Sequence, residues 1–418
     1  MTANPVANPR QFAAEEEVRA MLRLPVIAKA RSQAGALWKI AYGEDVPAEA
    51  AASFEQAMDE YVGNYLFKAA ACDPVTPGFV RNFMAAYAWR GAQVPGARMG
   101  GDNTDNCYRL AGIAHGGRYV VRLTPVGRAP AHVSFTLVGN WGTSVTIQTL
   151  ELALLDREAD GSAVITIDDR PAAGRPNHLT TAPHVKFLFV RDSLADWAVE
   201  TPLALEIVRV DEAVAPKLSL EDKAERAAFR LIEEVPLYYW FTRLGTGREP
   251  NRLDPPQPVG SIGGLVTQSS TLGRFRLAAD EAAILRYDPA GAAYCSVALY
   301  SWWFQSIDAE TRQTSLTAAM STPNADGTVT CVVSARDPGI ANWVDTTGLV
   351  NTLPLIRWQG LPTQPVRHGP AFDLRIVPFD GLDAALAGEG GGRLGPGGRV
   401  AQLAARQAAY RRRITPSA

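Results

Sequence analysis

The sequence predicts a mainly β protein with helical additions, an α+β chain that contains antiparallel β-sandwich or jelly-roll-like units. Two stretches carry this prediction, residues 118–210 and 273–379. Each holds short β-branched segments separated by clusters of Gly, Pro, Asp and Asn. The first ninety or so residues instead place apolar side chains at helical spacing. Because the chain has 418 residues, we expect two folded units that share an interface.

The chain divides into five predicted parts in order. These are a helical N-terminal region (1–99), a first β unit (100–217), a bridging helix (218–247), a second β unit (248–380), and a Gly-rich linker with a C-terminal helix (381–418). Helices are predicted over 15–34, where Pro25 interrupts the pattern, and over 48–71 and 77–89. Ser219 can cap the bridging helix, since acidic residues follow in its first turn.

The predicted strands fall into two sets. The first set is RYVVRLTP, AHVSFTLVG, SAVITIDD, VKFLFVRD and PLALEIVRV; the second is GRFRLA, AILRYD, CSVALYSWW, GTVTCVVSA, LPLIRWQ and FDLRIVPF. One segment of each set, EADGSAVITI and NADGTVTCVVS, begins with the Asp-Gly step that is typical of a hairpin turn. The two matches hint at related β units but do not establish an internal repeat.

Composition excludes several classes of protein. A net charge of −2 with a pI near 6.3 is not the basic excess of a nucleic-acid binder. No apolar run approaches the length that spans a membrane, and the N-terminus shows no secretory signal, so we expect a cytoplasmic protein with no membrane partner. The four cysteines are far apart, which disfavours a disulfide framework or a zinc site: Cys72, Cys107, Cys295 and Cys331.

Motifs for cofactors and metals are also missing. The sequence contains no dinucleotide fingerprint after a strand, no phosphate-binding loop and no GxSxG elbow, which disfavours nucleotide use and serine hydrolysis. We expect no cofactor. The five histidines show no metal-ligand spacing, and we expect no metal: His115, His132, His178, His184 and His368. His132 lies within a predicted strand and is the first candidate among them for a general acid or base.

Two polar segments could carry chemistry. GGDNTDNCY, residues 100–108, is either a tight turn or a pair of carboxylates, Asp102 and Asp105, placed beside Tyr108 for acid–base work. ARDPGIANWVDTTGLVNTLPLIRW, residues 335–358, is either a structured loop or an Arg fork with aromatic faces around a carboxylate or sugar. We expect Arg357 to lie against the 100–108 loop.

A third segment, residues 300–304, is aromatic. Because alternate residues of a strand face opposite sides, the rings of YSWWF cannot all point into one core, and some of them are candidates for a pocket. Together these segments give the predicted site. Its catalytic candidates are Asp102, Asp105, Tyr108 and His132, and its substrate-binding candidates are Arg122, Tyr300, Trp302, Trp303, Asn342, Trp343 and Arg357.

Several motifs resemble those of proteins that carry Domain of Unknown Function 1214. They include GGDNTDNCYRLAGI, SWWFQSIDAETRQTSL and ADGTVTCVVSARDPGIANWVDTTG, and the resemblance spans roughly residues 100–358. It implies a β-sandwich-rich fold with helical additions and leaves the chemistry undefined. It puts weight on Asp102, Asn103, Asp105, Tyr108, Arg122, Asp337, Asn342, Trp343, Asp345, Arg357 and Trp358. The chain departs from the family pattern at Thr104, where members commonly have Pro, and at Val344, where they often have Leu.

The function that we favour from the sequence is a cofactor-independent catabolic enzyme acting on a small aromatic or hydrophobic carboxylic acid, as a lyase or decarboxylase. Arg122 or Arg357 would hold the carboxylate, aromatic side chains the ring, and an Asp, Tyr or His would move the proton. One alternative is a glycoside hydrolase-like or carbohydrate-binding protein, with Asp102 or Asp105 paired with Asp337 or Asp345. Another is a non-catalytic binding module. The expected partner is a small molecule, and the chain could form a homo-oligomer.

Overall fold

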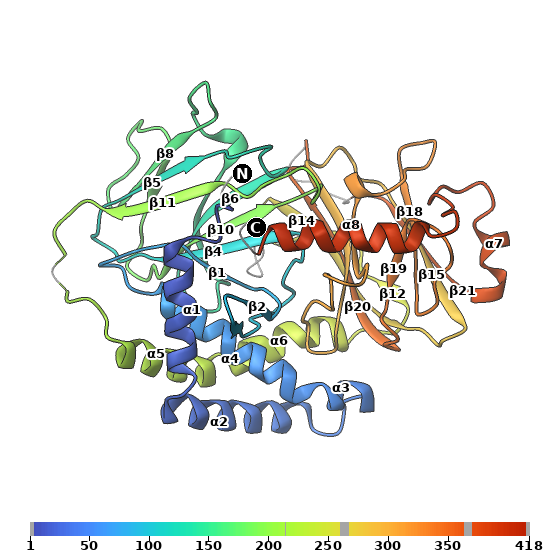
Figure 1. Ribbon diagram of the computed structural model, residues 1–418, viewed down its shortest axis with the longest axis horizontal. Coiled ribbons are helices and arrows are strands. Elements are labelled where there is room, and N and C mark those ends of the chain that lie inside the picture. The colour runs from blue at the N-terminus through green and yellow to red at the C-terminus, as the bar shows by residue number, and fades with distance from the viewer. Residues whose placement is uncertain (1–3, 214, 260–266, 363–369, 415–418) are drawn as a thin grey trace.

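The computed structural model describes residues 4–213, 215–259, 267–362 and 370–414. Two β-sandwiches lie side by side, and a layer of helices runs beneath them (Figure 1). Most strand pairs are antiparallel. The predicted class, mainly β with helical additions, is therefore confirmed.

The N-terminal region forms α1 (Pro9–Met21), α2 (Pro25–Tyr42), α3 (Ala48–Ala52) and α4 (Phe54–Ala71). The predicted interruption at Pro25 is confirmed, because α2 begins there. The predicted helix over 77–89 is wrong: β1 (Val80–Asn82) and β2 (Tyr87–Trp89) occupy it, and β2 pairs with β3 (Ala92–Val94). Phe83 has a positive φ, which an α-helix cannot contain, and Val80 pairs with Leu110 of the first sandwich.

The first sandwich follows. Its strands are β4 (Asn106–Gly112), β5 (Tyr119–Thr124), β6 (His132–Val138), β7 (Thr146–Glu151), β8 (Ala163–Asp168), β9 (His178–Thr180), β10 (Phe187–Ser193) and β11 (Ala204–Arg209). They form a sheet of order β1-β4-β10-β6-β7 and a sheet of order β11-β5-β8-β9. Side chains such as Val121, Phe135, Ile165 and Leu188 fill the space between the sheets. The five strands predicted here are all present.

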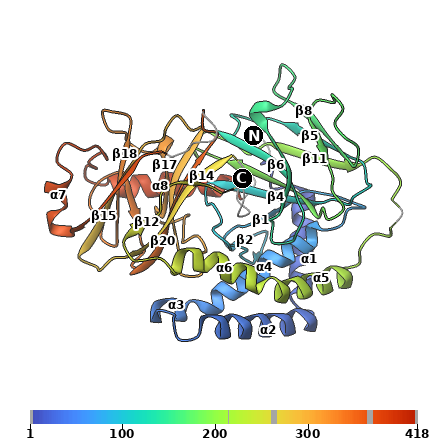
Figure 2. The ribbon, with the colours of Figure 1, turned by 180° about the vertical axis from the view of Figure 1, so that it is seen from behind.

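The bridging segment is two helices rather than one. Ser219 caps α5 (Leu220–Glu233) in a capping box with Asp222, as predicted. The chain then breaks at Glu234, and α6 (Val235–Thr246) begins. Pro236 accounts for the break, because proline donates no backbone hydrogen bond and its ring clashes with the preceding turn. Figure 2 shows α5 and α6 passing beneath the two sandwiches.

The second sandwich is built from β12 (Arg252–Leu253), β13 (Gln257–Pro258), β14 (Gln268–Arg276), β15 (Glu281–Tyr287), β16 (Tyr294–Tyr300), β17 (Ser315–Thr317), β18 (Val329–Ser334), β19 (Trp343–Asp345), β20 (Asn351–Gln359) and β21 (Phe372–Pro378). The short α7 (Leu382–Ala385) and then α8 (Gly398–Arg412) follow. At one end of α8 Arg399 lies over the Trp343 ring, and at the other Arg412 donates to the Trp197 carbonyl. This helix therefore joins the two sandwiches.

The two sandwiches have the same topology. The order β4-β10-β6-β7 recurs as β14-β20-β16-β17, and β11-β5-β8-β9 recurs as β21-β15-β18-β19. Even the parallel pairing of β8 with β9 recurs between β18 and β19. The two Asp-Gly turns hinted at related β units, and the fold contains such a repeat.

Cys72, Cys107, Cys295 and Cys331 are all buried free thiols. Within the described ranges, no helix combines the length and the apolar character needed to cross a membrane.

Candidate functional site

A cavity of about 480 Å³ lies between the two sandwiches, above α6. This volume is within the range of small-molecule sites. One wall is the outer face of β4 and β10, the facing wall is the outer face of β14 and β20, and α6 contributes Tyr238, Phe241 and Leu244. Loops complete the lining at residues 99–102, 142–144 and 254–259 and at Phe304.

Strand alternation directs one arginine from each sandwich into this cavity. On β10, Leu188 and Val190 point into the sandwich core, so Phe189 and Arg191 face the other way. On β20, Ile356 points into the second core, while Leu355 and Arg357 face the cavity. Arg191 was not among the sequence-predicted residues, whereas Arg357 was.

Arg191 is buried and has few partners. Its guanidinium donates to the Thr136 hydroxyl at 3.3 Å and lies 4.1 Å from the centre of the Phe189 ring. Only 8% of the residue is exposed, and burial lowers its pKa to about 10. Burial therefore destabilises the charged guanidinium of Arg191 relative to an exposed arginine, because no counter-ion offsets its desolvation.

Arg357 is held more firmly. Its two terminal nitrogens donate to the Tyr300 hydroxyl and to the carbonyl of Gly101. The expected contact between Arg357 and the 100–108 loop is thus present. The residue is 5% exposed. Nearby tyrosines raise the pKa of the guanidinium against the desolvation that lowers it.

Among the described residues, no carboxylate forms an ion pair with either arginine. The cavity is lined by two acids, of which Asp254 is paired with Arg248. The stretches outside the description contain no Asp or Glu. Arg191 in particular is a desolvated cation with no ion pair among the described residues, and an anionic ligand would compensate it.

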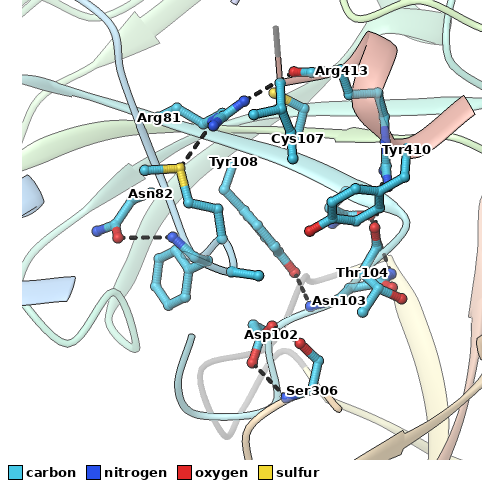
Figure 3. A pocket seen from close by; sticks show the side chains of 15 residues that line it. Arg81, Asn82, Asp102, Asn103, Thr104, Cys107, Tyr108, Ser306, Tyr410 and Arg413 are labelled. Carbon is cyan, nitrogen blue, oxygen red and sulfur yellow. Dashed lines mark hydrogen bonds between the residues drawn. The ribbon is translucent and has the colours of Figure 1, made fainter. Parts of the chain in front are cut away.

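The other acid, Asp102, accepts hydrogen bonds from the backbone N–H of Ser306 at 3.0 Å and from its hydroxyl at 2.6 Å (Figure 3). Burial raises the pKa of Asp102 to about 6, although the bonds from Ser306 and the charge of Arg98 lower it. A carboxyl group with this pKa can both take and give a proton near neutral pH.

Tyr108 stands beside Asp102 in the lining. Its hydroxyl oxygen accepts from the backbone N–H of Asn103 at 3.0 Å (Figure 3), and within the described ranges no acceptor takes its proton. Burial raises the pKa of Tyr108, while the charges of Arg357 and Arg191, which line the same cavity, lower it.

Behind Asp102 and Tyr108 lies a second pocket, of about 40 Å³, which has room for a water-sized molecule (Figure 3). Arg413 crosses it to donate to the Thr104 carbonyl at 2.9 Å, and Arg81 donates to the carbonyl of Arg413 at 2.9 Å. These contacts fix the C-terminal end of α8 against the 100–108 loop.

Other predicted catalytic residues lie away from the cavity lining. Asp105 is buried and accepts from Trp197 at 3.0 Å and from Tyr294 at 2.5 Å, which indicates a structural role. His132 lies on β6, with its Nε2 3.2 Å from a carboxylate oxygen of Glu151. Neither residue lines the cavity.

The predicted binding residues are distributed over the molecule. Arg122 is exposed on β5, and Tyr300 supports Arg357 from behind. The Trp302 ring lies under Arg274, and Trp303 packs into the helical layer and donates to the Ala50 carbonyl at 3.0 Å.

In the 335–358 segment, the polar and indole groups outside the cavity make structural contacts. Asn342 donates to the carbonyls of Thr322 and Thr330, at 2.8 and 2.9 Å. The Trp343 indole donates to the Ser334 carbonyl at 3.1 Å. The two aspartates are paired, Asp337 with Arg399 at 3.0 Å and Asp345 with Arg312 at 2.7 Å. The paired carboxylates of the glycosidase alternative are therefore not assembled in the cavity.

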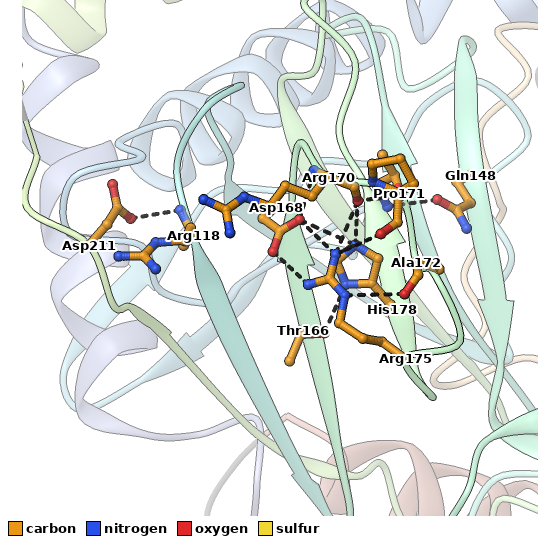
Figure 4. A network of polar contacts seen from close by, with 11 residues as sticks. Arg118, Gln148, Thr166, Asp168, Arg170, Pro171, Ala172, Arg175, His178 and Asp211 are labelled. Atoms are coloured by element: carbon orange, nitrogen blue, oxygen red, sulfur yellow. Dashed lines mark hydrogen bonds and ion pairs between the residues drawn. The ribbon is translucent and has the colours of Figure 1, made fainter.

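Another polar cluster lies on the first sandwich (Figure 4). Asp168 accepts from Arg175 at 2.7 and 3.1 Å and from the Arg170 backbone at 2.8 Å, and the bonds from Arg175 lower the pKa of Asp168 to about 2. His178 contacts the Thr166 hydroxyl at 2.8 Å. These groups satisfy one another and clamp the loop before β9.

In the described part of the chain, no group of three or more His, Cys, Asp or Glu side chains could hold a metal ion. His368, one of the five histidines, lies outside the described residues.

Two solved structures align with this chain, and neither carries a functional description. A crystal structure of an uncharacterized protein from Burkholderia cenocepacia aligns with a TM-score of 0.69 and 25% identity, over 87% of this chain and 99% of that chain. The VPA0106 protein from Vibrio parahaemolyticus aligns with a TM-score of 0.41 and 9% identity, over 77% of this chain and 99% of that chain. No protein-family model and no curated protein matches the sequence.

Proposed function

We propose that the central cavity binds a small carboxylic acid with an apolar or aromatic body, and that the protein is a cofactor-independent lyase acting on that acid. The observation that carries the proposal is the pair of buried arginines, Arg191 and Arg357, which line one cavity without a carboxylate partner among the described residues. Arginine suits this task because its planar fork pairs with a carboxylate through two hydrogen bonds.

The remaining lining supports an apolar ligand body. Phe83, Tyr108, Phe189, Phe241 and Phe304 all line the cavity. Aromatic side chains contribute large contact areas and stack on planar groups. The ligand we propose is therefore small, planar or aliphatic, and charged where it meets the guanidinium groups.

Asp102 is our candidate for the acid–base group. A lyase must move a proton as a bond to carbon breaks or forms, and a carboxyl group with a pKa of about 6 can do so near neutral pH. The unused proton of Tyr108 is available to a ligand oxygen. Decarboxylation is the subclass we favour, with Asp102 protonating the carbon that loses carbon dioxide.

The test begins with binding. Isothermal titration calorimetry against a panel of aromatic and aliphatic carboxylates, each with its neutral amide, should find acids that bind while their amides do not. Arg191→Gln and Arg357→Gln should each weaken binding by about tenfold or more, the worth of a charged hydrogen bond. Arg122→Gln is the matched control and should bind normally, since that residue is exposed on β5. Equal affinities in all four proteins would refute the site.

Turnover is then followed by carbon-13 NMR on each acid that binds. Asp102→Asn should retain binding and lose product formation. Turnover unchanged in Asp102→Asn would remove that residue from the proposal, and the absence of any product from every bound acid would favour the non-catalytic binding module. A cytoplasmic location, homo-oligomer formation and the resemblance to the Domain of Unknown Function 1214 proteins stay predictions.

A further inference from the structure

The two cavity arginines occupy the same position in the duplicated sandwich. Arg191 lies on β10, with Tyr108 and Ser134 as its neighbours on β4 and β6. Arg357 lies on β20, with Ser270 and Ser296 as its neighbours on β14 and β16. β10 and β20 are equivalent strands of equivalent sheets. The cavity is therefore made of two half-sites, each presenting one arginine.

The half-sites match beyond the arginines. Two residues before each arginine, Phe189 and Leu355 face the cavity from the same position. On β4 and β14, Asn106 and Gln268 are also equivalent, because they pair with Ser193 and Gln359 at the ends of the same two ladders, and both line the cavity. In each half-site, an apolar side chain and a polar side chain therefore lie near the arginine.

Each guanidinium has an anchor on its own sheet, and that of Arg357 also donates to the Gly101 carbonyl on the loop before β4. Arg191 donates to Thr136 on β6, and Arg357 donates to Tyr300 on β16. The two guanidinium groups have no hydrogen-bond partner in common, and like charges repel, which favours two separate binding points in the cavity. Both arginines line one cavity of about 480 Å³, a volume within the range of small-molecule sites.

We propose that the ligand is a dicarboxylic acid that lies across the cavity, with one carboxylate on Arg191 and the other on Arg357. This inference rests on the proposed binding of a carboxylic acid and names its class. A dicarboxylate neutralises both half-sites, whereas a monocarboxylate leaves one buried guanidinium without a counter-ion. The apolar part of the ligand lies between Phe189 and Leu355.

Calorimetry on the intact protein tests the proposal without requiring a variant to fold. The probes are terephthalate, succinate, adipate and suberate, each compared with its monomethyl ester. At least one diacid should bind about tenfold or more tightly than its monoester, since only the diacid gains the second charged hydrogen bond. The proposal is overturned if every diacid binds no more tightly than its ester.

Two variants separate this inference from the proposed function. Arg191→Gln and Arg357→Gln should each reduce diacid affinity to the level of the monoester, and Arg122→Gln should not. If ester and diacid bind equally and both variants abolish both, one carboxylate bridges the arginines: the dicarboxylate inference fails and the carboxylic-acid site stands. If no acid of either kind binds, both fail.

Discussion

Replacing Arg191 with methionine should stabilise the ligand-free protein and weaken its binding of acids. Methionine keeps much of the length of the arginine stem but removes a charge that sits in a desolvated wall with one hydroxyl as its hydrogen-bond partner. A buried ion without a counter-ion is a net cost to folding, and apolar replacements of buried ions are often stabilising.

The magnitude follows from the pKa of Arg191, which burial lowers from 12.5 to about 10. That shift corresponds to about 3 kcal/mol against the charged form in the folded state. The variant also loses the hydrogen bond to Thr136 and the contact with the Phe189 ring, together worth about 1–2 kcal/mol. We therefore expect a net gain of about 1–2 kcal/mol.

Differential scanning calorimetry of the ligand-free protein measures the effect, with Arg122→Met as the control because Arg122 is already exposed. We expect the Tm of Arg191→Met to rise by a few degrees and that of Arg122→Met to stay near the wild-type value. A fall in the Tm of Arg191→Met would show that the arginine is a structural element, and the argument for an anion site would lose its physical basis.

Three further predictions concern the cavity and its surroundings. Because the pKa of Asp102 is about 6, its protonation between pH 7 and pH 5 removes a negative charge from the cavity. The calorimetric affinity for the ionised form of a bound acid should therefore rise about tenfold over that range, and it should stay flat in Asp102→Asn. Trp303→Ala should lower the free energy of unfolding by about 3–5 kcal/mol in denaturant titrations, with ligand affinity unchanged, because its ring packs among the helices. Gly101→Ala should weaken ligand binding and lower the Tm more than Gly339→Ala does. Both glycines have a positive φ, so the backbone strain is similar. At Gly101 an added Cβ would also stand 2.7 Å from the Phe304 ring, whereas at Gly339 it would meet open space.

Residue types in the sequence were enough to find half of the candidate site. Arg357 and the Asp102–Tyr108 loop stood out because they are polar or aromatic in turn-rich segments, and the structure brings them into contact. Arg191 was missed because it sits in VKFLFVRD, a run that reads as an ordinary buried strand. Whether Arg191 faces a cavity depends on which face of β10 the helices leave uncovered. The sequence of β10 alone does not encode that arrangement.

One signal could have found Arg191. Gly161 and Gly327 of the two Asp-Gly turns are separated by the same sequence offset as Arg191 and Arg357. Extending that offset along the chain aligns FLFVRD with LPLIRW. The aromatic run 300–304 was harder to interpret, because the chain leaves β16 at Tyr300 and the following rings enter different environments.

The duplicated fold also bears on how a ligand would be oriented. A cavity made of two equal halves could not tell one end of a bound molecule from the other, so any preference must come from positions where the halves differ. Tyr108 stands where the second half has Ser270, and Thr136 where it has Ala298. Asp102 has no acidic counterpart at an equivalent strand position, and it follows Gly101, whose carbonyl accepts from Arg357. These few differences would convert a symmetric receptor into one with a reactive end and an anchoring end.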